Sequence, residues 1–103
     1  MINKIQQPTK LFRTRLDYLG NAYTSKVIDG ELCGYRKIND FYDIEISGLN
    51  NNKLKHPSFN VYVWQIKSGL TTVETHFDIK SIETLKRVLS ELCQKYQNLA
   101  PKM

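Results

Sequence analysis

The feature that most constrains the fold is a change in apolar spacing near residue 80. From residue 71 to 79, polar positions alternate with apolar or threonine positions, which is the period of a half-buried strand. Ser81 is a candidate N-cap before a stripe of apolar residues at helical spacing, and Pro101 marks the end of the expected helix. The stripe has steps of three and four residues and comprises Ile82, Leu85, Leu89, Leu92, Tyr96 and Leu99. The sequence therefore predicts an amphipathic helix over residues 82–99.

The region before this helix shows strand signals separated by turn residues. The Asp29-Gly30 pair lies between two apolar runs and predicts a tight hairpin, because a type I′ turn needs a positive φ at both central positions. Gly34 predicts a bulge or an edge position. The expected strands lie at about 12–18, 22–28, 31–38, 42–46, 59–66 and 71–79. We expect an α+β fold, an antiparallel β-meander of five to six strands covered on one face by a single C-terminal amphipathic helix.

The length of 103 residues fits one domain with one core. We expect residues 1–9 to form a flexible lead-in and residues 10–100 to form the domain. The longest unbroken apolar run is residues 61–64, far short of the roughly 20 residues of a membrane-spanning helix. The start of the chain lacks the apolar segment of a secretory signal, and Cys33 and Cys93 lie far apart. These features favour a cytoplasmic protein with reduced thiols and no membrane association.

Residues with catalytic or metal-binding chemistry form no recognisable motif. The two histidines and two cysteines show no local ligand spacing, and no glycine-rich phosphate loop is present. Two groups of titratable residues share strand faces, Asp43 with Glu45 and Glu74 with His76 and Asp78, but a solvated sheet face explains them more simply. We expect no enzyme activity, no catalytic residue, no metal and no cofactor.

Basic and tyrosine residues gather in the first three expected strands. The chain has 15 Lys and Arg against 10 Asp and Glu, a net charge of +5. The candidate nucleic-acid-binding set is Arg13, Arg15, Lys26, Arg36, Lys37, Tyr23 and Tyr35. Arginine and lysine neutralise phosphates while aromatic rings stack on bases. The sequence therefore favours binding of nucleic acid, single-stranded or through its backbone, by a basic strand face.

A protein partner is the alternative to nucleic acid. Residues 59–66 are apolar on both faces of their expected strand, and an Asn-rich loop precedes them. The corresponding candidate residues are Tyr62, Trp64, Asn51, Asn52 and Lys53. Under this hypothesis the chain is an inhibitor, immunity or adaptor protein that acts by blocking its partner. It would be of phage or plasmid type, encoded by a mobile genetic element. Burial of Trp64 in the core is the simpler interpretation of that residue. A homodimer is compatible with either function.

Overall fold

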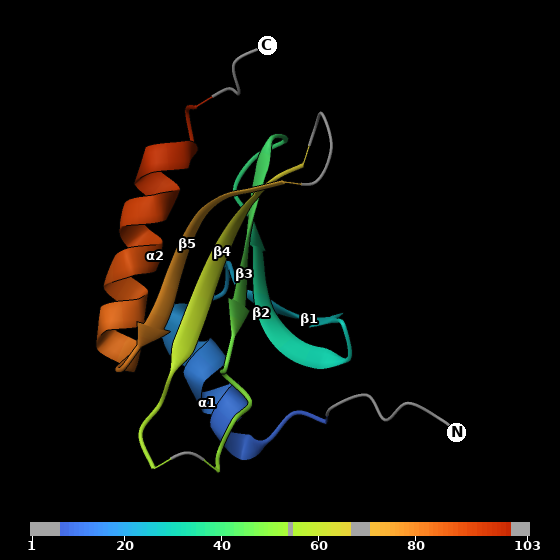
Figure 1. Ribbon diagram of the computed structural model, residues 1–103, viewed down its shortest axis with the longest axis vertical. Coiled ribbons are helices and arrows are strands. Elements are labelled where there is room, and N and C mark those ends of the chain that lie inside the picture. Colours follow the sequence, from blue (N-terminus) through green and yellow to red (C-terminus); the bar gives the residue numbers. More distant parts are fainter. Residues whose placement is uncertain (1–6, 54, 67–70, 100–103) are drawn as a thin grey trace.

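The fold is a five-stranded antiparallel sheet with two helices, seen in a computed structural model that describes residues 7–53, 55–66 and 71–99. The strands follow one another across the sheet in chain order, as Figure 1 shows. The elements are α1 (Lys10–Leu19), β1 (Thr24–Ile28), β2 (Glu31–Lys37), β3 (Tyr42–Ser47), β4 (Phe59–Gln65), β5 (Thr71–Ile79) and α2 (Ile82–Tyr96). The predicted α+β class, antiparallel meander and C-terminal helix are confirmed.

The first expected strand is wrong, because residues 10–19 form helix α1. Thr9 caps this helix, with its hydroxyl oxygen accepting a hydrogen bond from the Phe12 amide at 3.0 Å. Phe12, Leu16 and Leu19 are spaced by four and three residues, so a helix directs all three toward the core. The expected strand rests on a period of two through Phe12, Thr14, Leu16 and Tyr18, but Thr14 and Tyr18 are exposed and do not belong to a buried face.

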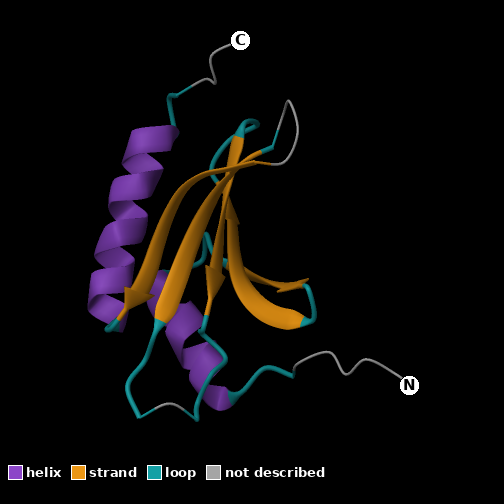
Figure 2. Cartoon of the chain, viewed as in Figure 1, coloured by secondary structure: helices purple, strands orange, loops and turns teal. Residues whose placement is uncertain are grey.

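Both helices pack on the same face of the sheet. Their buried residues join alternate residues of β3 and β4 in one cluster. The cluster includes Phe12, Leu19, Leu85, Leu89 and Leu92 from the helices and Tyr42, Ile44, Ile46, Phe59, Val61 and Val63 from the strands. The β1–β2 hairpin extends on the side away from α2 (Figure 2). The intervening residues of β3 and β4 are only half-buried, so they belong to the opposite face.

The predicted turn between β1 and β2 is confirmed by positive φ angles of 51° at Asp29 and 80° at Gly30. Gly34, by contrast, lies in regular pairing within the interior strand β2, where neither a bulge nor an edge occurs. A Cβ atom at Gly34 would lie 2.7 Å from Cδ1 of Leu49, which is fully buried. Gly34 therefore makes room for the loop after β3, and the irregular pairing lies between β4 and β5 instead.

The C-terminal helix agrees with the prediction at its start and ends earlier than expected. Ser81 caps α2 by accepting a hydrogen bond from the Thr84 amide at 3.1 Å, and the helix ends at Tyr96. Pro101 and residues 1–6 of the expected lead-in lie outside the described residues. Within the described ranges, neither helix is long and apolar enough to cross a membrane.

Candidate binding surface

The sheet face opposite the helices is called the open face, and the strand register defines it. Directly opposed residues of neighbouring strands share a face. One row therefore crosses β2 to β5 through Tyr35, Glu45, Tyr62 and Thr75. A second row contains Lys37, Asp43, Trp64 and Thr72, and β1 adds Lys26 and Ile28. No described helix packs on this face.

Aromatic side chains cluster on the open face over β4 and β5. Trp64 and Tyr62 are half-buried there, and neither belongs to the core cluster. Phe77 is 62% exposed and meets Tyr62 edge to face, with ring centroids 5.7 Å apart. The expectation that Trp64 fills the core is therefore wrong, because the alternation of β4 gives the core side to Phe59, Val61 and Val63.

Two carboxylates lie beside these rings on β3. Asp43 accepts a hydrogen bond from the Tyr35 hydroxyl at 2.8 Å, and Glu45 accepts one from Nε1 of Trp64 at 3.2 Å. Among the described residues, no basic nitrogen lies within 4.0 Å of either carboxylate. Both carboxylates are therefore held by neutral donors.

The pKa values around β3 indicate a negative local field. Burial raises the pKa of Glu45, and the charges of Glu31, Asp29 and Asp43 raise it further, although the Trp64 hydrogen bond opposes the change. Burial and nearby carboxylates raise the pKa of the Cys33 thiol to about 12. Burial and the hydrogen bond to Asp43 raise the pKa of Tyr35 to about 12. Burial is the largest cause of each change, and nearby carboxylates shift all three pKa values further in the same direction.

A shallow depression of about 360 Å³ opens between these groups. Its lining includes Lys26 and Ile28 of β1 together with Tyr35, Asp43, Glu45 and Trp64. Nζ of Lys26 lies 4.4 Å from the centroid of the Tyr35 ring, which is a cation–π contact. The depression therefore combines aromatic walls, the carboxylates of Asp29, Asp43 and Glu45, and one resident cation.

The predicted basic strand face does not form. Arg13 and Arg15 belong to a helix, where residues two positions apart point in different directions. Arg36 lies on the helix side of the sheet, with its guanidinium 5.4 Å from the Tyr23 ring centroid, and Tyr23 is buried. Only Lys26, Tyr35 and Lys37 of the predicted set lie on the open face, where Lys37 pairs with Asp40 at 3.5 Å.

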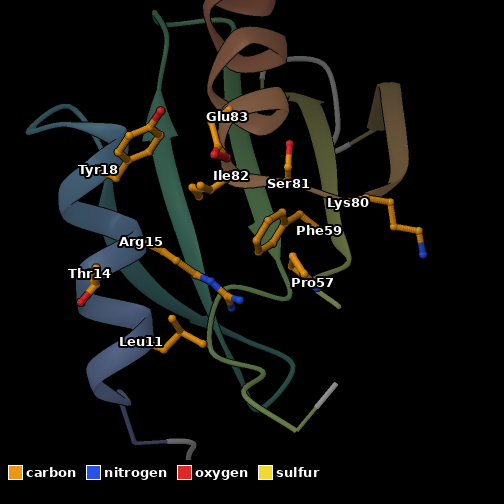
Figure 3. A pocket seen from close by; sticks show the side chains of 10 residues that line it. All are labelled: Leu11, Thr14, Arg15, Tyr18, Pro57, Phe59, Lys80, Ser81, Ile82 and Glu83. Carbon is orange, nitrogen blue, oxygen red and sulfur yellow. The ribbon is translucent and has the colours of Figure 1, made fainter. Parts of the chain in front are cut away.

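Arg15 stabilises the loop that follows β3. Its Nη1 donates to the carbonyl oxygen of Leu49 at 2.9 Å and also reaches those of Gly48 and Asn51. The guanidinium lies 4.9 Å from the Phe59 ring centroid. A mostly apolar pocket of about 350 Å³ lies between α1 and the start of α2. Figure 3 shows the Arg15 side chain extending from α1 across this pocket. The Arg15 guanidinium therefore serves to stabilise the fold.

The residues of the predicted protein-binding set lie in two places. Asn51, Asn52 and Lys53 are exposed in the loop that leaves the C-terminal end of β3. Trp64 pairs with Asp43 near the start of β3, so it lies toward the opposite end of that strand. Tyr62 and Trp64 share the open face, and the Asn-rich loop forms a separate exposed segment.

The expected row of Glu74, His76 and Asp78 is also divided. Glu74 and His76 lie on the helix side of β5 and are 2.7 Å apart, whereas Asp78 has a φ of 59° and contacts Ser58 and Lys80. Burial opposes ionisation of Glu74, but hydrogen bonds from Lys95, His76 and Tyr96 outweigh it and lower the pKa of Glu74 to about 2. This cluster fastens the edge strand β5 to α2.

In the part of the chain that the structure describes, no three potential metal ligands come together. The chain matches no protein-family profile, no curated protein sequence and no solved structure.

The sequence predicts that Asp43 and Glu45 share one strand face, but it does not connect them with Trp64 and Tyr35. The signal was present in the alternation of residues 42–46, which assigns both carboxylates to the face opposite Ile44. The missing information was the strand register, which sets Asp43 beside Trp64 and Glu45 beside both Tyr35 and Tyr62.

Proposed function

We propose that this chain is a small, non-enzymatic binding protein that contacts a protein partner through the open face of its sheet. The position of Trp64 carries the proposal, because the single tryptophan of the chain lies on the uncovered face instead of in the core. Tyr62 and the exposed ring of Phe77 extend the aromatic surface beside it. Tryptophan and tyrosine are the residues most enriched at energetically important positions of protein interfaces.

The charge of the open face favours a protein partner over a nucleic acid. The face carries Lys26 and Lys37 against Glu31, Asp43 and Glu45. Nucleic-acid phosphates gain affinity from clustered cations, and carboxylates beside the aromatic rings oppose that gain. An open face with this composition suits a neutral or basic protein surface better.

Nucleic-acid binding remains a second candidate, supported by the charge of the helices. The segments α1 and α2 together carry six basic and three acidic residues. Arg13, Lys86 and Arg87 are among the exposed basic residues. A backbone-directed contact would therefore use the helix side of the molecule, away from the open face.

Affinity capture with matched variants tests the proposal. Phe77→Ser removes an exposed ring from the open face, whereas the pair Arg13→Ala and Arg87→Ala removes exposed charge from the helices. We expect the Phe77→Ser chain to lose a protein captured by the native chain and the helix variant to retain it. The opposite pattern, together with oligonucleotide binding that weakens steeply with salt, would support the second candidate instead.

The effect on the captured partner then distinguishes the kinds of binding protein. An inhibitor or immunity protein abolishes the partner's activity at stoichiometric concentration, whereas an adaptor leaves that activity intact. Measuring the partner's activity with the native chain and with the Phe77→Ser variant separates these outcomes, and we expect only the native chain to inhibit.

A further inference from the structure

We propose that the depression on the open face takes an arginine side chain of the protein partner, with the guanidinium beside the Trp64 and Tyr35 rings and against the carboxylates of Asp43 and Glu45. This inference rests on the proposed function and specifies the partner's chemistry. The depression of about 360 Å³ gives room for one side chain. Its aromatic walls come from β2 and β4, on either side of the acidic strand β3.

The two carboxylates come from one face of β3 and both line the depression. Asp43 and Glu45 are two residues apart along the strand, so their Cα atoms are about 7 Å apart. Each accepts a hydrogen bond from an aromatic donor, Tyr35 for Asp43 and Trp64 for Glu45. A carboxylate has two oxygen atoms and about four acceptor positions, so each retains acceptor capacity toward a partner.

The charge of the site is complementary to a cation. Within the described ranges, neither carboxylate has a basic nitrogen within 4.0 Å. A planar guanidinium has five N–H donors, can bind a carboxylate through two of them and stacks on aromatic rings. Arginine therefore fits this combination of flat walls and carboxylates better than lysine, whose ammonium is a compact, strongly hydrated charge.

Lys26 shows that the site already accommodates a cation from the chain itself. Its Nζ lies 4.4 Å from the Tyr35 ring centroid, at the β1 side of the depression. An incoming guanidinium would compete with this ammonium for the ring and for the local negative field. Removing the Lys26 charge is therefore expected to strengthen arginine binding, whereas removing a carboxylate charge is expected to weaken it.

A peptide titration tests the inference through the fluorescence of Trp64, which is the only tryptophan. The probe is an acetylated and amidated Gly-Gly-Arg-Gly-Gly peptide at millimolar concentrations, and the control replaces arginine by citrulline, its uncharged isostere. We expect a saturable change in Trp64 emission with the arginine peptide and at least about tenfold weaker binding of the citrulline peptide. Equal responses to both peptides, or no response to either, overturn the inference.

Isosteric variants locate the binding at the depression. Asp43→Asn and Glu45→Gln retain an oxygen that accepts the Tyr35 or Trp64 hydrogen bond but lose the charge. We expect each to weaken arginine-peptide binding several-fold, Lys26→Gln to strengthen it, and Glu91→Gln on the exposed side of α2 to leave it unchanged. Far-ultraviolet circular dichroism and melting temperature confirm that each variant is folded. Wild-type binding by both carboxylate variants contradicts the proposed site.

The two proposals fail in distinguishable ways. If Phe77→Ser abolishes partner capture while the arginine peptide shows no preference over citrulline, the open face binds a protein and only the arginine inference is overturned. If Trp64 emission responds to a single-stranded oligonucleotide and not to the peptide, the occupant is nucleic acid and both proposals are overturned.

Discussion

The indole nitrogen of Trp64 donates a hydrogen bond to Oε1 of Glu45 at 3.2 Å on the uncovered face of the sheet. The two residues lie on neighbouring strands, β4 and β3, and are diagonal in the register because Trp64 is directly opposite Asp43. This contact fixes the largest aromatic side chain of the open face over a carboxylate. It also holds part of the negative charge of that face in place.

Trp64→Phe is expected to raise the pKa of Glu45 above its value in the native chain. Burial already raises this pKa, and the indole hydrogen bond opposes that rise by stabilising the ionised carboxylate. Phenylalanine keeps an aromatic ring but provides no donor. Carboxyl chemical shifts of Glu45 followed by NMR against pH give the measurement. An unchanged midpoint would show that the hydrogen bond does not stabilise the carboxylate in solution.

Arg15→Ala is expected to lower the free energy of unfolding by about 1–3 kcal/mol, since it removes charged hydrogen bonds to the loop after β3. Arg13→Ala is the matched control in the same helix, because Arg13 is exposed and its loss should change stability by less than about 0.5 kcal/mol. Urea unfolding followed by circular dichroism compares the variants. Equal effects of the two substitutions would contradict the assigned role of Arg15.

Gly34→Ala is expected to destabilise the fold by about 1–3 kcal/mol because the added methyl group overpacks the core beside Leu49. The shorter side chain in Leu49→Ala removes the obstructing Cδ1 atom. In the double variant the cost of the added methyl should therefore largely disappear, and the two effects should not be additive. Strict additivity in urea unfolding would place the cost of the alanine elsewhere.

The Glu74 cluster is expected to make stability depend on acid pH. The pKa of Glu74 in the folded chain is about 2, below its ordinary value of 4.5. The ionised carboxylate therefore stabilises the fold at pH values above about 4.5. This contribution is lost as the pH falls from about 4.5 toward 2. Glu74→Gln should therefore reduce stability at neutral pH and flatten its decline over this range. Parallel stability–pH curves for the two chains would exclude this role for Glu74.

Periodicity was sufficient to predict the elements whose burial repeats over several residues. The helix at 82–96 and the alternating strand β3 were recognisable because each buries one regular face. Residues 12–18 have the pattern of a strand because Thr14 and Tyr18 complete a period of two with Phe12 and Leu16. The N-cap at Thr9 and the helical spacing of Phe12, Leu16 and Leu19 favour a helix instead.

The candidate site depended on information that a single sequence does not contain. Arg13 and Arg15 would share a surface with Lys26 only if all three lay on adjacent strands, and helix α1 separates them. The neighbours of Trp64 depend on which residue of β3 lies opposite it. The loop between β3 and β4 and the packing of the core together determine this register. The strand register therefore decides which residues meet on the open face.

The most direct test of the open face is photo-cross-linking from position 77 in living cells. Benzoylphenylalanine at Phe77 keeps an exposed aromatic ring on β5, and the same group at Arg87 on the exposed side of α2 serves as the matched control. We predict a covalent complex with one discrete protein from position 77 and none from position 87. A protein cross-link that forms from position 87 alone would contradict the assignment of the open face as the binding surface.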